Sequence, residues 1–220
     1  MNQLRRIIWS SSASQSVKAL VACAAIAVSA IWMFSSFRAR PVQLPVTDQE
    51  FIGERAATET ARLLSGGGAV VVVGPDMNLH YDLLMEAQVK GFQKTVKKQG
   101  KISILASEQL HLTPRQRATG LTAEMYFDLL AKYPSANGIV SFIGVGEFAN
   151  SDLQRVPTQR PMLVSVSLNA FPPRRLFQSE IVQLAIGPRP DQSAPGGKPK
   201  SQAEWFEQNY RVATADNLPE

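Results

Sequence analysis

Four polar residues that are suited to binding a small ligand follow a run of valines. Val70 to Val73 extend from a glycine cluster, and Gly74-Pro75 ends the apolar run. The polar residues that come next are Asp76, Asn78, His80 and Asp82. Carboxylates and amides of this kind hydrogen-bond the hydroxyl groups of a sugar or another small polar molecule. Asp76 and Asn78 are also residue types that shape turns and cap helices, so this structural role remains an alternative.

Three further polar residues come after predicted strands at 138–144 and 162–167. They are Glu147, Asn150 and Asn169. Arg174 and Arg175 follow Asn169 after two prolines, which predict a rigid loop. Because the carboxyl ends of parallel strands meet at one edge of a sheet, where ligands bind in such folds, these side chains are candidate ligand contacts.

The sequence offers little for catalysis, metals or cofactors. His80 and His111 are the only two histidines, and Cys23 is the only cysteine. A catalytic triad or a multi-histidine metal site therefore has few residues to draw on. The three glycines at 66–68 precede the valines, and no lysine follows at phosphate-loop spacing. We expect a protein without enzymatic activity, metal or cofactor; an enzyme that uses Asp76 and His80 is a third alternative.

The net charge of +5 comes from the N-terminal segment. Residues 1–40 contain five of the 23 basic side chains and none of the 18 acidic ones. The remaining residues are therefore neutral as a whole. A nucleic-acid-binding protein needs a basic face, so we expect no nucleic acid as a partner.

An uncharged run of 19 residues, 19–37, lies between Lys18 and Arg38. At about 1.5 Å per residue it is long enough to cross a bilayer core of about 30 Å as one helix. More basic residues precede this run than follow it closely, which favours a cytoplasmic N-terminus. We expect a single-pass membrane anchor with an extracytoplasmic, periplasmic body.

Other fates of the N-terminus remain open. Val28-Ser29-Ala30 is a small-residue cleavage site, and Arg5-Arg6 is typical of a twin-arginine signal, so a cleaved signal peptide would release the body into the periplasm. The apolar run continues through Ile31–Phe34, which favours an uncleaved anchor. Leu20–Cys23 is similar to a lipoprotein signal, but too few apolar residues precede it.

Hydrophobic periodicity beyond the anchor predicts alternating helices and strands. Thr47 and Glu50 form a capping-box pattern at the start of the first helix. The predicted helices are 47–64, 81–99 and 121–132, with a short one within 147–156; the strands are 69–74, 101–106, 138–144, 162–167 and 181–186; and 110–117 is a loop. Lysines near the end of the second helix suit the helix dipole and are expected to be solvated: Lys94, Lys97, Lys98 and Lys101. This alternation predicts an α/β domain whose sheet is parallel.

The chain is expected to be divided into six parts. These are a basic segment (1–18), the anchor (19–37), a spacer (38–46), the α/β domain (47–187), a strap rich in proline and glycine (188–202) and a C-terminal segment (203–220).

Four passages, in this order, resemble the type I periplasmic binding proteins of the sugar-binding kind. They are Lys90–Phe92 inside a helix, Gly100–Leu105 before and in a strand, Leu129–Val140 across a helix-to-strand junction, and Tyr210–Asn217 near the end. Ser135 stands where that family has an aspartate. The resemblance covers about residues 66–217 and implies a three-layer domain, with a mostly parallel sheet flanked by helices, that is like one lobe of the family.

That family closes two lobes on a ligand, and this chain has room for one. The resemblance therefore implies a sugar or small polar ligand, with self-association or a partner lobe to complete the site. We expect a membrane-anchored extracytoplasmic domain with a role in ligand binding, transport or sensing. The alternative is a non-catalytic scaffold or docking subunit of a membrane or envelope complex.

Overall fold

The computed structural model describes residues 46–65, 67–76, 83–189 and 199–218. These residues lie within one compact unit, Pro45–Glu220. The predicted anchor at 19–37 lies outside the described residues. Among the helices that are described, none is both long and apolar enough to cross a membrane.

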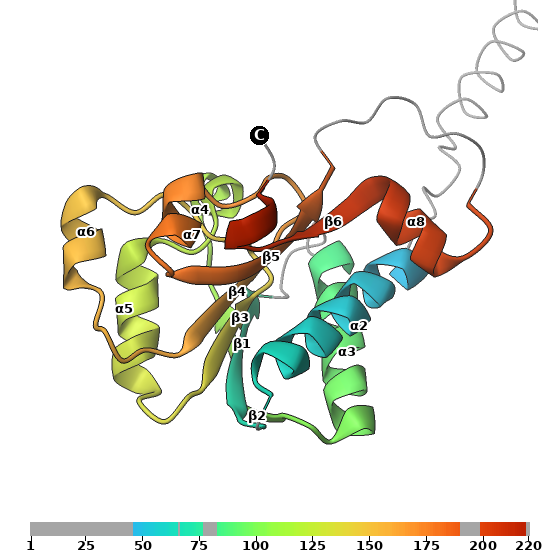
Figure 1. Ribbon diagram of the computed structural model, residues 1–220, viewed down its shortest axis with the longest axis horizontal. Coiled ribbons are helices and arrows are strands. Elements are labelled where there is room, and N and C mark those ends of the chain that lie inside the picture. The colour runs from blue at the N-terminus through green and yellow to red at the C-terminus, as the bar shows by residue number, and fades with distance from the viewer. Residues whose placement is uncertain (1–45, 66, 77–82, 190–198, 219–220) are drawn as a thin grey trace, which may run out of the picture. The chain divides into compact units, whose positions relative to one another are not determined.

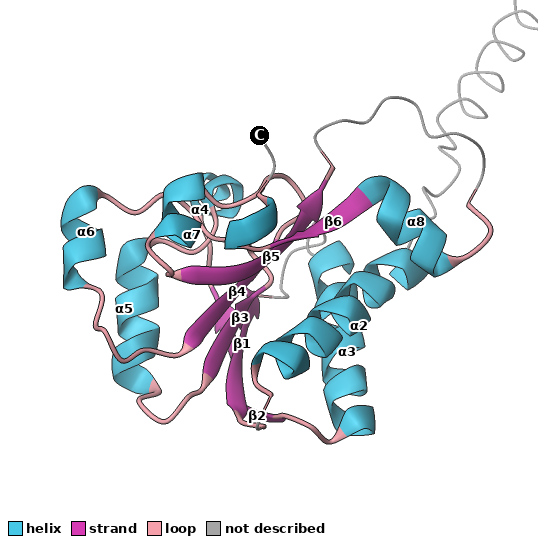
Figure 2. Cartoon of the chain, viewed as in Figure 1, coloured by secondary structure: helices cyan, strands magenta, loops and turns pink. Residues whose placement is uncertain are grey.

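A single six-stranded sheet forms the centre of this unit (Figure 2). Its spatial order is β2-β1-β3-β4-β5-β6. The strands are β1 (Ala69–Pro75), β2 (Ser103–Leu110), β3 (Gly138–Ser141), β4 (Met162–Val166), β5 (Val182–Pro188) and β6 (Tyr210–Ala213). The first five strands are parallel, and β6 pairs antiparallel with β5.

Helices cover both faces of the sheet (Figure 1). They are α2 (Val46–Leu63), α3 (Leu83–Gln99), α4 (Pro114–Thr119), α5 (Ala123–Lys132), α6 (Asn150–Arg155), α7 (Arg174–Gln178) and α8 (Gln202–Asn209), and a 3₁₀ turn follows at Ala215–Asn217. Side chains of α2, α3 and α8 form one core with the sheet, and side chains of α5 and α7 form the other. The predicted three-layer α/β fold with a mostly parallel sheet is confirmed.

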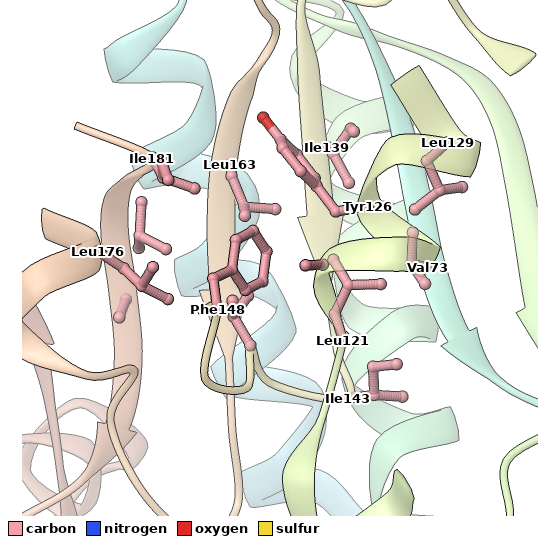
Figure 3. Close-up of a cluster of buried hydrophobic side chains, with 14 of the residues drawn as sticks. Val73, Leu121, Tyr126, Leu129, Ile139, Ile143, Phe148, Leu163, Leu176 and Ile181 are labelled. Atoms are coloured by element: carbon pink, nitrogen blue, oxygen red, sulfur yellow. The ribbon is translucent and has the colours of Figure 1, made fainter. Parts of the chain in front are cut away.

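The valine run is buried on both faces, as four β-branched residues without alternation predict. Val71 and Val73 belong to the core that contains Tyr126, and Figure 3 shows Val73 within it. Val70 and Val72 point into the core that contains Phe92. Because β1 lies inside the sheet and contributes to both cores, it holds the two helical layers together.

The helices α2 and α3 touch backbone to backbone. A Cβ atom built on Gly53 would lie 1.8 Å from the Gln88 carbonyl oxygen, and one on Gly91 would lie 2.0 Å from the Glu50 carbonyl oxygen. Beside this contact, the buried Gln88 amide donates a hydrogen bond of 2.7 Å to Gln49. The close packing of α3 against α2 therefore explains why a glycine, Gly91, stands inside the predicted second helix.

Residues 110–117 were predicted as a loop, and this prediction is wrong because α4 begins at Pro114. Thr113 caps the helix: its hydroxyl accepts from the Gln116 N–H, and the Gln116 side chain accepts from the Thr113 N–H. Proline at the first helical position is already fixed near the helical φ angle. This capping box supplies the start signal of a helix that is too short to show periodicity.

Several element boundaries also differ from those predicted. β2 runs from Ser103 to Leu110, later than the predicted 101–106, and α7 follows the two prolines where only a loop was expected. α2 begins at Val46, so Thr47 lies within its first turn. The short helix predicted within 147–156 is present as α6.

The C-terminal residues add α8 and β6 to the same unit. β6 pairs with β5 from Pro188↔Tyr210 to Ala185↔Ala213. The Gln202 side chain donates a hydrogen bond of 3.2 Å to the Thr47 carbonyl, which places the start of α8 beside the start of α2.

Candidate functional site

A hollow of about 220 Å³ opens where β3 and β4 end, and we call it the carboxyl-edge hollow. Among the residues that line it are Arg117, Thr119, Gly144, Glu147, Ser167 and Asn169. Two of the predicted binding residues, Glu147 and Asn169, therefore meet in one site. They come from the loops after neighbouring strands, which is the arrangement that parallel pairing predicts.

Backbone groups bring the walls of the hollow close together. Gly144 has a φ of 74°, and a Cβ atom on it would lie 3.2 Å from the Ser167 hydroxyl oxygen. A Cβ atom on Gly146 would lie 2.5 Å from the Thr119 carbonyl oxygen. The buried Ser141 hydroxyl donates a hydrogen bond of 2.7 Å to the Gly144 carbonyl and fixes this turn. Glycines are required here because the chain turns tightly between two neighbouring loops.

The Ser167 hydroxyl orders the loop that carries Asn169. It accepts hydrogen bonds from the backbone N–H groups of Asn169, at 3.2 Å, and Ala170, at 3.3 Å. Asn169 is exposed, so its amide remains accessible to a ligand. A serine hydroxyl that accepts hydrogen bonds from the N–H groups two and three residues later commonly stabilises a turn after a strand.

Glu147 forms an ion pair at the hollow with Arg175, which lies on α7. The Arg175 Nη2 atom lies 2.9 Å from the Glu147 carboxylate and also donates to the Phe148 carbonyl. The Glu147 side chain is 74% exposed, so this pair contributes only about 0–1 kcal/mol to stability. The carboxylate can therefore accept hydrogen bonds from a ligand hydroxyl at little cost.

Asp76 lies at the end of β1 and contacts His111, which follows β2. The Asp76 carboxylate lies 3.4 Å from His111 Nδ1, and the Asp76 N–H donates to the Leu110 carbonyl at 2.9 Å. Asp76 does not line the carboxyl-edge hollow. The other predicted residues of this loop, Asn78, His80 and Asp82, lie outside the described residues.

Asn150 is the first residue of α6 and is not part of the lining of the hollow. The backbone N–H of the neighbouring Ala149 donates a hydrogen bond of 2.9 Å to the Asp152 carboxylate, so its partner comes from α6 itself. The structure thus brings Glu147 and Asn169 together and places Asn150 on the following helix.

Sequence reasoning missed Arg117, Thr119 and Ser167 as lining residues. Arg117 and Thr119 belong to α4, whose capping box at Thr113 and Gln116 was the available signal. Ser167 ends a predicted strand and had no distinguishing feature in the sequence. Within the part of the chain that the structure describes, no three His, Cys, Asp or Glu side chains are grouped to hold a metal ion.

The sheet order and the helices on both faces define a three-layer α/β domain with a hollow at the carboxyl edge of its sheet. No protein-family model matches the sequence, and no curated protein matches it. Solved structures do match. They include GanP, a glucose-galactose binding protein from Geobacillus stearothermophilus, at 16% identity and a TM-score of 0.51, over 79% of this chain and 62% of that one.

Two other solved structures have the same fold. The sugar-binding protein of a sugar ABC transporter from Bacillus halodurans is 17% identical, with a TM-score of 0.52, over 77% of this chain and 62% of that one. A solute-binding protein from Burkholderia graminis, in complex with D-arabinose, is 16% identical, with a TM-score of 0.52, over 77% of this chain and 60% of that one.

These likenesses show the fold. The predicted resemblance to one lobe of a type I periplasmic binding protein is confirmed at that level. The chain covers about three-fifths of the length of the solved structures that it matches.

Proposed function

We propose that this protein binds a small polar ligand of the sugar type at the carboxyl edge of its sheet, in a transport or sensing role without enzymatic activity. The observation that carries the proposal is the meeting of Glu147 and Asn169 in one hollow after β3 and β4. A carboxylate, an amide and a hydroxyl together supply both donors and acceptors, which neighbouring sugar hydroxyls require. Asp76 and the residues that follow it, Asn78, His80 and Asp82, form the other part of the proposed site.

A second wall completes this site. The hollow of about 220 Å³ is smaller than the roughly 300–1,000 Å³ of sites that enclose a small molecule. The solved structures of this fold are longer than the chain, and one of them is a XylFII-LytSN complex, 14% identical, with a TM-score of 0.52, over 78% of this chain and 61% of that one. We propose that a second copy of the chain or a partner lobe supplies the missing wall.

The proposed location is the extracytoplasmic side of a membrane, with residues 19–37 as the anchor. The length and lack of charge of that run support the proposal. If the N-terminus is cleaved instead, the body is secreted to the periplasm. Mass spectrometry of the protein from the membrane fraction and from the periplasmic fraction distinguishes the two, because cleavage after Ala30 removes the first 30 residues.

Calorimetric titration of the full chain in an uncharged detergent against a panel of sugars tests the binding function. We expect one sugar class to bind, and Glu147→Gln and Asn169→Ala to weaken its affinity at least about tenfold. The first variant replaces a charged acceptor by a neutral amide, and the second removes an amide from a small site. Gln154→Ala is the matched control, since Gln154 is exposed on α6 outside the hollow. Absence of binding by every sugar, or equal loss in all three variants, would contradict the proposal.

A scaffold or docking subunit of an envelope complex is the second candidate. The observation that favours it is the single lobe, since a domain that lacks the second wall is free to present this edge to another protein. Affinity purification from detergent-solubilised membranes tests it. Arg174 is exposed at the start of α7. A stoichiometric partner that is recovered with the wild-type chain and lost with Arg174→Glu supports the scaffold. Recovery of the chain alone argues against it.

A further inference from the structure

A second concave surface lies between the outer sides of α2 and α3. This α2–α3 groove has a volume of about 370 Å³. It is lined by Phe51, Glu54, Arg55, Thr58, Lys94, Thr95, Lys98 and Gln99. The groove uses the middle of α2 and the last turns of α3, whereas the carboxyl-edge hollow uses the loops after β3 and β4. The two sites therefore share no residue.

Three cations and one carboxylate line the groove, which gives the lining a net charge of +2. Lys94 and Lys98 form no ion pair within the described part of the chain. Other cations of the same two helices do pair: Lys90 lies 3.0 Å from Glu50, and Arg62 lies 2.8 Å from Glu59. The ammonium groups of Lys94 and Lys98 are thus both available to a ligand in the groove.

Lys94 and Lys98 are four residues apart on α3, so their side chains lie on the same side of the helix. Like charges at this spacing destabilise a helix, and an anion bound between them removes that repulsion. Helix dipole compensation explains a cation in the last turn of α3, such as Lys98, but it acts only within that turn. It does not explain why Lys94 faces the same groove.

The third cation is held in place at the groove. The Arg55 guanidinium lies 5.7 Å from the centre of the Phe206 ring and 3.5 Å from the Glu59 carboxylate. A cation over an aromatic face is attracted by the ring and loses part of its freedom. Arg55 therefore offers a positioned donor on the α2 side, opposite the two lysines of α3.

Neutral polar side chains complete the lining. The Gln99 amide donates a hydrogen bond of 3.2 Å to the Thr58 hydroxyl, which itself donates to the Glu54 carbonyl at 3.0 Å. The Thr95 hydroxyl has no such partner among the described residues and remains available. Ammonium groups and the Thr95 hydroxyl donor around a concave surface suit the oxygens of a phosphate group.

We propose that the α2–α3 groove binds a phosphate-bearing small molecule through Lys94, Lys98 and Arg55. The volume of about 370 Å³ is larger than a bare phosphate needs, so the class of ligand is a phosphomonoester or a glycerophosphate group. The same chemistry occurs in a soluble metabolite and in the headgroup of an acidic phospholipid. Glu54 opposes the anion and limits its affinity.

Calorimetric titration of the full chain with glycerol 3-phosphate, in an uncharged detergent at constant ionic strength, tests the groove. We expect Lys94→Ala/Lys98→Ala to weaken the affinity at least about tenfold, since two charge-assisted contacts are lost. Glu54→Gln should strengthen it, because the repelling carboxylate becomes neutral.

The matched control is Lys97→Ala/Lys101→Ala. It removes the same charge from the last turn of α3 and from the residues just after it, and neither residue lines the groove. It should change the affinity less than about twofold. An equal loss in both double variants would show only a diffuse basic surface, and absence of binding by the wild-type chain would also overturn the proposal.

Nanodiscs distinguish the two sources of the phosphate group. If the headgroup is the natural ligand, discs of phosphatidylglycerol that hold the full chain should abolish binding of soluble glycerol 3-phosphate. Discs that obtain the same surface charge from a fatty acid, whose head group is a carboxylate, should leave the binding of glycerol 3-phosphate intact. If the ligand is soluble, the affinity is the same in both kinds of disc. Either result supports the groove and assigns its ligand.

Discussion

At the scale of single residues, Tyr126 combines complete burial with an unused hydroxyl group. Its side chain packs among aliphatic groups and Phe148 in one of the two cores (Figure 3). Its hydroxyl has no hydrogen-bond partner among the described residues. Burial raises the pKa of Tyr126 from 10.0 to about 12. The neutral phenol is therefore stabilised in the folded state relative to the phenolate.

Tyr126→Phe should leave the free energy of unfolding at pH 7 unchanged or raise it by about 1 kcal/mol, because it removes a buried polar group without a partner. A raised pKa in the folded state gives stability that is complete below pH 10 and is lost as the pH rises through 12. The variant should therefore lose less stability over that range. Urea denaturation at pH 7 and at pH 11 measures both effects.

Tyr210→Phe is the contrasting variant. Burial also raises the pKa of Tyr210, but its hydroxyl has a hydrogen bond with the Gln49 side chain. Removal of this hydroxyl should lower the free energy of unfolding by about 1 kcal/mol. If both tyrosine variants are destabilised alike, the Tyr126 hydroxyl has a partner after all, and the explanation given for it is wrong.

The sequence could predict some site residues because their position depends only on strand order. Glu147 and Asn169 follow adjacent parallel strands, so their meeting needed no knowledge of side-chain packing. Ser167 and Thr119 could not be predicted in this way. Their roles depend on the turn at Gly144 and on contacts between loops, which local composition does not specify.

At the scale of elements, the contact of α2 with α3 depends on two glycines. Gly53→Ala and Gly91→Ala each place a methyl group about 2 Å from a backbone carbonyl oxygen of the other helix. Each variant should lose about 1–3 kcal/mol of stability, because the helices must separate to admit it. This loss should exceed the gain of about 1 kcal/mol that alanine gives in a helix.

Gly74→Ala is the control for these two variants. A Cβ atom there would lie 3.5 Å from Val89, an ordinary contact, and Gly74 does not have a positive φ. Its stability should change by less than about 0.5 kcal/mol. Thermal denaturation of the three variants under identical conditions measures how much stability each one loses. Equal losses at all three positions would show that α2 and α3 do not depend on close packing at Gly53 and Gly91.

The long elements could be predicted from periodicity, and the short ones could not. α3 and α5 have enough turns for apolar residues to mark one face, whereas α4 and α7 have six and five residues. α4 had a capping signal in Thr113 and Gln116. α7 begins after Pro173, which makes no side-chain cap, so only the packing of Leu176 and Phe177 into the core reveals it.

At the scale of the whole molecule, the pairing of β6 with β5 was beyond sequence reasoning. β6 has only four residues and follows α8 directly, so it shows no alternation of its own. Its partner strand ends more than twenty residues earlier, across the proline-rich strap. A contact between segments so far apart in the chain depends on the exposed edge of β5, which is a property of the assembled sheet.

The carboxyl-edge hollow is open on the side away from the sheet-end loops that line it. Sites that enclose small molecules have volumes of roughly 300–1,000 Å³, and this open hollow measures about 220 Å³. If a second copy of the chain supplies the other wall, ligand binding and association are linked, and each strengthens the other by the same factor.

Saturating sugar should therefore raise the fraction of dimer of the full chain in detergent, measured by sedimentation velocity over a range of protein concentrations. Glu147→Gln should abolish the effect of sugar on the dimer fraction. If the carboxylate acts only through the ligand, this variant should leave the dimer fraction without sugar unchanged. Tight binding by a chain that stays monomeric at all concentrations would exclude the second copy. The missing wall would then have to come from this chain's own residues outside the described part or from a different protein.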